Sequence, residues 1–454
     1  MSSLPLSRPR LTLIGAAFGF VVVLLDVSVV NVALDAFRLD FATSVTGLEW
    51  VVNAYTLTFA ALLLMAGALG DRHGARRIFL AGFVLFTAAS VACGVAPTLA
   101  TLVMARIVQG AGAALLVPNS LSLIQQAFLC QEARSRAVGW WGAAGGIALA
   151  AGPVAGGFLV AHLGWRSIFL INLPIGLIGS AITLRYAGKS AVNRERSLDL
   201  PGQLVAIVAL AALAMALIDA GHLGWANPRI IAPMATAVIS TAAFIGIEAR
   251  RAAPMLPLGL FRERAFSVAS ISGVLVNFAY YGLIFVFSLF FQWQEEFSPQ
   301  QTGLAFLPMT LVLVVASILG GRLITRIGAR RLMVLGQTSA AVGYLLLLAT
   351  LSAGSYAALV LPMFIAAGGV ALTVPTMTNL TLSSVEPSRA GVASGVLNTA
   401  RQLGGMLGVA VCGYLVREAE ASAFMEGLRL SLTLAATLLL AGALLSFLGL
   451  ERKA

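Results

Sequence analysis

The segment GARRIFL at residues 74–80 recurs almost unchanged as GARRLMV at residues 328–334, 254 positions further along the chain. A second pair of segments, SRAVGWWG at residues 135–142 and SRAGVASG at residues 388–395, is separated by 253 positions. Two unrelated motifs that repeat at almost the same offset indicate an internal duplication. We therefore expect two homologous halves.

The composition places this chain in a membrane. Of its 454 residues 59% are apolar and only 10% are charged, and the mean hydropathy is +0.95. A soluble protein carries about 25% charged residues, so this chain has too few to cover a surface that faces water. Apolar stretches of about 20 residues, each long enough to cross a hydrocarbon layer about 30 Å thick, recur along most of its length. This excludes a cytosolic enzyme, a secreted module and a disordered regulator, and predicts an all-α integral membrane protein.

Breaks at glycine, proline and charged residues divide the apolar sequence into fourteen expected membrane spans. Six spans belong to an N-terminal bundle (1–187), two are inserted together with their cytoplasmic linkers (188–265), and six form a C-terminal bundle (266–454). Two six-helix bundles related by a pseudo-two-fold axis are typical of secondary transporters. The expected spans are 11–34, 48–69, 78–96, 99–123, 137–161, 168–186, 201–220, 229–247, 266–291, 303–320, 332–352, 355–378, 390–415 and 428–450.

The cations define the orientation of these spans. With a cytoplasmic N-terminus, 22 of the 29 Lys and Arg residues fall in cytoplasmic segments, five fall in outer segments and two lie inside spans. This bias follows the positive-inside rule and predicts that both termini are cytoplasmic. The net charge of +11 is therefore a topology signal and does not indicate nucleic-acid binding.

Asp26 in the first span and Arg106 in the fourth are the clearest charged residues inside the N-terminal bundle. They lie eight and seven residues from the outer ends of their spans, which at 1.5 Å per residue is a depth of about 10–12 Å for both. A carboxylate and a guanidinium at one depth form a candidate proton switch, because movement of the cation changes whether the carboxylate holds a proton. The alternative is a static ion pair, which is costly in lipid.

Three further charged residues are open to more than one interpretation. Arg401 lies about 16 Å into the thirteenth span with no acidic residue at that depth in the C-terminal half. It either faces a water-filled cavity and attracts anionic or polar substrate groups, or contacts backbone carbonyls. Glu49, at the outer start of the second span, is either a second titrating group or a solvated helix cap. Asp219, near the outer end of the seventh span, is expected to be solvated.

The loop GALGDRHGARR at residues 67–77 combines glycines with charges in a specific pattern. Gly67 and Gly74 allow tight packing and a sharp turn, and Asp71 can pair with a cation or a helix N-terminus. The arginines taken alone only set topology. The second copy, GRLITRIGARR at residues 321–331, has Thr325 where the first has Asp71. An acid-dependent contact is therefore expected in one half only.

Substrate contacts are predicted from polar and aromatic residues near mid-membrane. Cavities for large amphipathic ligands are mostly apolar with a few polar groups that align the ligand. Tyr280 and Tyr281 are equally compatible with simple packing or an interfacial belt. The candidates are Trp50, Asn53, Gln109, Asn277, Phe278, Tyr280, Tyr281 and Arg401.

Several of these segments resemble motifs of the major facilitator superfamily. The loop at 67–77 is similar to its signature loop, RIVQGAG at 106–112 to its proton-linked motif, and LDVSVVNVAL at 25–34 to a motif of its fourteen-span drug:proton antiporters. Residues 165–176 and 390–405 also match that group, and MALIDAG and VNFAYYG resemble stretches of methylenomycin-resistance-type exporters. The antiporter motif is matched in the fifth span by Gly142, Gly146, Gly152, Pro153, Gly156 and Gly157.

The resemblance implies a major facilitator fold that exports drugs or small amphipathic metabolites across the inner or plasma membrane by alternating access. The proton gradient would drive export without a cofactor. By this resemblance Asp26 carries the coupling proton, Arg106 tunes it, and the fifth-span motif packs on the second half and seals the outer side. Two departures are Ser28 in place of the usual threonine, and Glu49 in place of an amide, which leaves open an extra proton or a preference for cations. The implied cytoplasmic gate comprises Gly67, Asp71, Arg72, Gly74 and Arg76.

Two other functions compete with export. A proton-linked importer on the same fold is the alternative, and the glycine–proline pattern of the fifth span argues against it. A membrane enzyme needs a cluster of catalytic or metal-binding groups, which the three histidines near span ends and the three cysteines without metal spacing do not provide. We therefore expect no enzyme, no metal site and no nucleic-acid partner. The expected partners are a small-molecule substrate, protons and the lipid bilayer, with the chain functional as a monomer.

Overall fold

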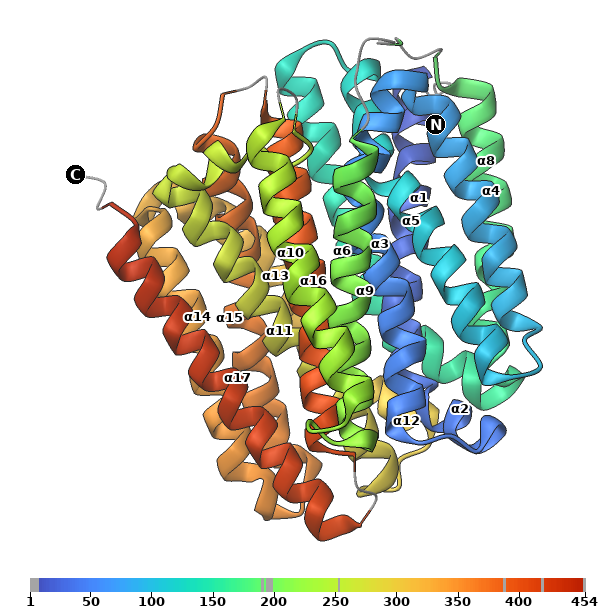
Figure 1. The fold of residues 1–454 in the computed structure, drawn as a ribbon, viewed down its shortest axis with the longest axis vertical. Helices are drawn as coiled ribbons and strands as arrows, with labels where there is room; N and C mark the ends of the chain where they lie inside the picture. Colours follow the sequence, from blue (N-terminus) through green and yellow to red (C-terminus); the bar gives the residue numbers. More distant parts are fainter. Residues whose placement is uncertain are drawn as a thin grey trace, which may run out of the picture.

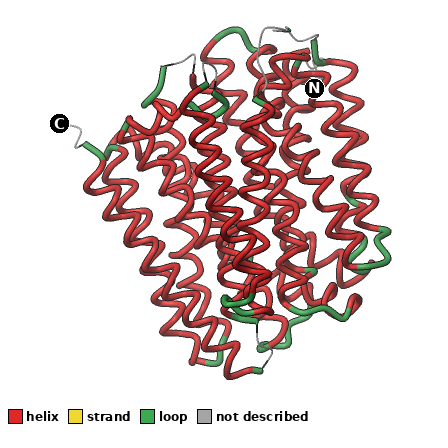
Figure 2. Tube along the Cα trace, viewed as in Figure 1, coloured by secondary structure: helices red, strands yellow, loops and turns green. Residues whose placement is uncertain are grey.

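The computed structural model describes residues 8–188, 192, 199–251, 254–386, 389–417 and 420–451. Their regular structure is helical, and the long helices run side by side between two faces (Figures 1 and 2). The first residues of α1 and the last residues of α17 lie at one face, which we call the terminal face, and the other is called the opposite face. The helices are α1 (Arg8–Val32), α2 (Leu34–Phe41), α3 (Val45–His73), α4 (Ala75–Gly94), α5 (Leu99–Ala127), α6 (Gln131–Leu163), α7 (Ser167–Leu170), α8 (Asn172–Tyr186), α9 (Leu200–Leu223), α10 (Pro228–Arg250), η1 (Leu258–Arg262), α11 (Arg264–Trp293), α12 (Pro299–Ala305), α13 (Leu307–Ile327), α14 (Ala329–Thr350), η2 (Leu351–Ala353), α15 (Tyr356–Ser383), α16 (Ala390–Leu415) and α17 (Ala421–Gly449).

The described helices account for fourteen crossings between the two faces. Thirteen segments are long and apolar enough to span a membrane, with α7 and α8 forming one of them and α12 and α13 another. The fourteenth is α16, which is 26 residues long but less apolar than the others, since it carries Arg401 and several small and polar residues. The thirteen candidate spans are roughly consistent with the fourteen expected, and most helices extend beyond the apolar runs because polar residues continue them at both faces.

Glycines make the equivalent turn in the two halves. Gly74, with φ of 94°, joins α3 to α4, and Gly328, with φ of 81°, joins α13 to α14. Residues with a Cβ rarely adopt such positive φ values, which explains why both copies of the GARR motif begin with glycine. The turn expected at Gly74 is confirmed. The prediction of tight packing at Gly67 is wrong, because a Cβ there would lie 3.8 Å from Pro118, which is an ordinary contact.

The inserted helices lie across the seam between the two bundles. Helices α1–α8 form one bundle and α11–α17 the other, and α9 and α10 run in front of their junction (Figure 1). The bundles meet where α3 packs on α16 and where α6 packs on α12 and α13. Helix α9 covers the first of these contacts through a cluster that includes Ile218, Met406, Ala410 and Trp50.

Parts of three expectations fall outside the described residues. These are most of the linker at 188–199, Ser388 of the second repeat, and the side chain of Thr325. The domain boundaries at 187 and 265 stay predictions.

Candidate functional site

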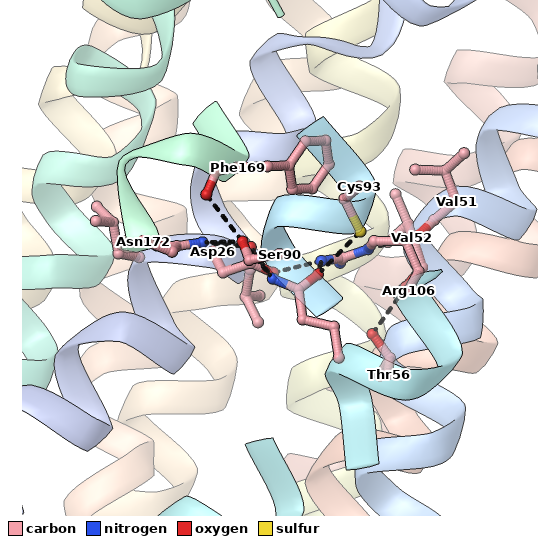
Figure 3. Close-up of polar contacts among 12 residues, drawn as sticks. Asp26, Val51, Val52, Thr56, Ser90, Cys93, Arg106, Phe169 and Asn172 are labelled. Carbon is pink, nitrogen blue, oxygen red and sulfur yellow. Dashed lines mark hydrogen bonds and ion pairs between the residues drawn. The ribbon is translucent and has the colours of Figure 1, made fainter. Parts of the chain in front are cut away.

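Asp26 and Arg106 form an ion pair in the interior of the N-terminal bundle (Figure 3). Asp26 on α1 is 0% exposed and Arg106 on α5 is 1% exposed. Nη1 of Arg106 bonds to Oδ2 of Asp26, and Nε of Arg106 donates to the carbonyl of Val51 over 3.1 Å. The equal depths expected from the sequence therefore correspond to a contact. The two charges neutralise each other where neither one alone would be tolerated.

Amide side chains complete the shell around this carboxylate. Gln109 and Asn172 donate to Oδ1 of Asp26 over 2.8 and 3.0 Å, and both also donate to the hydroxyl of Ser90. Gln109 accepts in turn from Arg106 over 2.8 Å. Three side-chain donors thus converge on this one carboxylate, which is buried out of contact with solvent.

Two members of this shell were missed from the sequence, and a third was given another role. Ser90 on α4 and Asn172 at the start of α8 are polar residues in apolar spans, a weaker form of the signal that identified Asp26. The chain breaks between α7 and α8 at Ile171, which brings Asn172 to the carboxylate and the carbonyl of Phe169 to Ser90. Gln109 was expected in the substrate cavity, and in this structure its amide is fully occupied by the ion pair.

A small cavity of about 10 Å³ lies between the two bundles, which is room for about one water molecule. Its wall comes from α1 and α6 on one side and from α11 and α13 on the other. Tyr280 and Tyr281 line it, as expected for substrate candidates. Polar groups of Ser28, Asn31 and Thr310 also face it. A drug-sized molecule does not fit this volume.

The other substrate candidates do not line this cavity. Asn277 donates to the carbonyl of Gly273 within its own helix, and Phe278 is buried, with its backbone against Gly408. Asn53 is buried, with neither amide atom partnered among the described residues. Trp50 packs against α9 and donates to Asp219 over 3.1 Å. Buried polar groups in a span do not identify a cavity, because the rotation of the helix decides where they face.

The glycines of α6 differ in what they contact. Gly157 lies against the start of α12, where a Cβ would come within 2.5 Å of the carbonyl oxygen of Pro299, and the carbonyl of Pro153 lies against Gly303. Gly152 and Gly156 instead pack on Ser28 and Val29 of α1.

Near the terminal face, a Cβ on Gly142 or Gly146 would have nothing within 4 Å. The expectation that all these glycines pack on the second half is therefore wrong. Gly157 and Pro153 make that contact, at the opposite face, whereas in the terminal half of α6 Gly142 and Gly146 have no close neighbour and Gly145 packs on Phe20 of α1.

Glu49 is a buried carboxyl at the seam between the bundles. It is 1% exposed, and Oε1 lies in the space left by Gly413 of α16 without a hydrogen-bond partner among the described residues. The interpretation as a solvated cap is wrong, since α16 covers the side chain. Asp219 of α9 is half-buried and not freely solvated, because it accepts from Trp50.

Arg401 has no ion pair or hydrogen bond with any residue in the described part of the chain. Its Nε is sealed from solvent and unpartnered, while the residue as a whole is partly exposed. Of the two interpretations left open, the one in which Arg401 contacts backbone carbonyls is therefore wrong.

The gate residues lie at the terminal face. Arg76 donates to the carbonyl of Leu184 at the end of α8, within the first bundle. Gly70 lies against Asn119, which donates to the carbonyl of Ala66 over 3.1 Å and joins α3 to α5. Asp71 is exposed and Arg72 is partly exposed. Their role as a gate stays a prediction.

Comparison with known proteins agrees with this architecture. A protein-family model described as "Major Facilitator Superfamily" matches residues 16–409 of the sequence. The chain belongs to this superfamily. It is a transporter and not an enzyme.

The curated relatives have names that refer to drug resistance. The methylenomycin A resistance protein of Streptomyces coelicolor is 40% identical over 400 residues, which are 88% of this chain and 84% of the relative. The multidrug resistance protein Stp of Mycobacterium tuberculosis is 39% identical over 403 residues, 89% and 75% of the two chains. Among solved structures, a D-xylose–proton symporter has a TM-score of 0.71 at 15% identity, covering 98% of both chains, which shows the shared fold.

Proposed function

We propose that this transporter exports drugs or small amphipathic metabolites across the plasma membrane in exchange for protons, by alternating access. The observation that carries the proposal is the sealed Asp26–Arg106 pair with its shell of three polar side chains. Relatives named for drug resistance, 40% and 39% identical, support export as the direction of transport. No cofactor is required, because the proton gradient supplies the free energy.

In this mechanism Asp26 exchanges one partner, Arg106, for another, a proton. A proton that reaches Asp26 removes the charge that holds Arg106 in place. Arg106 keeps its bond to the Val51 carbonyl and its position 4.2 Å above the ring centre of Tyr55. Helix α1, which packs on α5 and also on α6 and α11, is then free to shift against its neighbours. Loss of the proton on the cytoplasmic side restores the pair.

The test uses inside-out membrane vesicles with an acidified lumen and a pH-sensitive dye. We expect an exported antibiotic to dissipate the proton gradient in vesicles that contain the protein, and not in vesicles from cells with an empty vector. Symport would reverse the sign, because substrate entering the lumen would carry protons in the same direction. That result would favour the alternative function, a proton-linked importer.

We propose that Glu49 is a second group that binds and releases a proton. Its protonation favours closure of the contact between α3 and α16. A buried carboxylate without a donor is costly, so Glu49 holds a proton when Gly413 covers it. The titratable groups that face it from other helices are Asp219 of α9 and Cys412 of α16. When the seam opens at the opposite face, water reaches Glu49 and the carboxyl ionises, so closure must take up a proton from that side.

This leads to a pH dependence that the substitution Glu49→Gln removes. At higher external pH more Glu49 is ionised in the open state, so closure is disfavoured and transport by the wild type slows. The glutamine is neutral at every pH, and we expect its transport rate to fall less steeply as external pH rises from about 6 to 8. Uptake rates in vesicles buffered separately on the two sides measure this. Identical pH profiles for variant and wild type would contradict the role of Glu49.

Cys130 provides a test of the proposed orientation, in which the terminal face is cytoplasmic. It is exposed between α5 and α6, whereas Cys93 and Cys412 are buried. Backbone N–H groups of Ala133 and Glu132 lower the pKa of the Cys130 thiol, so a larger fraction is reactive thiolate at neutral pH.

We expect a membrane-impermeant maleimide to label inside-out vesicles and not intact spheroplasts. The variant Cys130→Ser should abolish the labelling. Labelling of intact spheroplasts would place both termini outside.

A further inference from the structure

The charges inside the spans do not balance around Arg401. Asp26 and Arg106 neutralise each other. Glu49 is no counter-ion for Arg401, because it lies beside Gly413, twelve residues further along α16, which is a distance of about 18 Å. Arg401 thus stands without a carboxylate at ion-pair distance among the described residues. A lone cation in a span is costly unless water or a ligand compensates it.

The side chain of Arg401 lies beside the wall of the central cavity. A Cβ on Gly273 of α11 would lie 3.3 Å from Cγ of Arg401, so the stem of the arginine runs along this small residue. The next turn of α16 carries Gly405, which the ring of Tyr281 covers, and Tyr281 itself lines the cavity. Arg401 and Tyr281 are close enough to interact electrostatically. The partly exposed guanidinium therefore belongs to the substrate region.

Polar groups continue from Arg401 along one face of α16 toward the terminal face. Ser394, Asn398 and Arg401 are spaced four and three residues apart, so they share that face, and all three are partly exposed. The bundles pack tightly between α6 and α12 at the opposite face, whereas nearer the terminal face no atom lies within 4 Å of a Cβ placed on Gly142 or Gly146 of α6. A ligand from the terminal side would meet this polar face first and Arg401 at its deep end.

We propose that Arg401 selects the charge of the substrate, which is an anionic amphiphile with a carboxylate or a similar single negative group. The carboxylate binds the guanidinium and the Tyr281 hydroxyl, and the apolar body lies against the aliphatic and aromatic part of the cavity wall. This inference rests on the proposed function as an exporter. The apolar wall is formed by Val27, Leu149, Ile284, Phe306 and Met309.

Transport of such a substrate in exchange for a proton moves net charge across the membrane. When one monoanion leaves the cell and one proton enters, the net charge moved inward is +2. When one monocation leaves and one proton enters, no net charge is moved. A membrane potential that is negative inside therefore drives the first exchange and leaves the second unaffected.

The test compares two probes with one apolar body and opposite charges, pyrenebutyrate and pyrenebutyltrimethylammonium. Their equilibrium binding is measured on the full-length protein in nanodiscs, with empty nanodiscs subtracted. We expect the wild type to prefer the anion, Arg401→Gln to weaken anion binding at least tenfold without weakening cation binding, and Arg401→Lys to restore most of it. Gln402→Ala, a neighbouring change on α16, should leave both affinities within twofold of the wild type.

Three results would overturn the inference. The wild type could prefer the cation, it could bind neither probe, or Arg401→Gln could weaken the binding of both probes equally. Recovery by Arg401→Lys shows that charge and not folding is responsible. Proteoliposomes then separate the inference from the proposed function. If the anion binds through Arg401 but its transport moves no protons, charge selection stands and proton-coupled export fails.

Discussion

Replacing Asp26 by asparagine is expected to abolish proton-coupled transport. Asparagine has the shape of aspartate, so its carbonyl oxygen still accepts from Gln109 and Asn172. It cannot exchange a proton, and it leaves the guanidinium of Arg106 buried without a counter-ion. Removal of one partner from a buried ion pair typically costs about 3–5 kcal/mol, so we also expect a lower unfolding temperature.

A double variant separates these two effects. In Asp26→Asn/Arg106→Gln both charges are absent, so we expect the unfolding temperature to recover most of the loss while drug-driven proton movement stays absent. Inside-out vesicles measure the proton movement, and purified protein measures unfolding. Drug-driven proton movement at the wild-type rate in Asp26→Asn would show that the coupling proton binds elsewhere and that the ion pair is structural.

The ion pair could be predicted from the sequence because depth along a helix follows from residue count. The rise per residue is fixed, so residue numbers alone place Asp26 and Arg106 at one level in the membrane. The turn at Gly74 could be predicted because this glycine lies in the charged loop between two apolar runs. What could not be predicted is the rotation of each helix about its axis, because apolar residues surround most of these spans on every side.

The errors share this cause. Gln109 was assigned to the cavity from its position one turn from Arg106, but that face of α5 points at Asp26. Glu49 lies at the end of an apolar run, as a helix cap would. It is buried because its side chain fits the space left by Gly413, which is distant in the sequence. The break at Ile171 that delivers Asn172 lies inside a stretch that the sequence predicts as one apolar span, although Asn172 and Pro174 interrupt it directly after the break.

A large steric effect is expected from Gly157→Val at the contact between α6 and α12. A Cβ at this position would lie 2.5 Å from the carbonyl oxygen of Pro299 and 3.0 Å from Cα of Gln300. These are backbone atoms at the start of a capped helix, held by Ser298 and Gln301, so they cannot move aside as a flexible side chain would. The closed opposite face is therefore destabilised, and we expect transport to fall more than tenfold while the protein still reaches the membrane.

Two measurements distinguish blocked closure from misfolding. Gly246→Val on α10, where a Cβ meets nothing within 4 Å, should transport normally and serves as the matched control. The second measurement uses Thr310→Cys, a position that lines the central cavity, in a Cys130→Ser background. In Gly157→Val this cysteine should react faster with an impermeant maleimide added from outside, because the opposite face no longer seals. Unchanged labelling together with normal transport would mean that α6 and α12 do not form the outer seal, since every cycle of an alternating-access exporter has to pass through that closed contact.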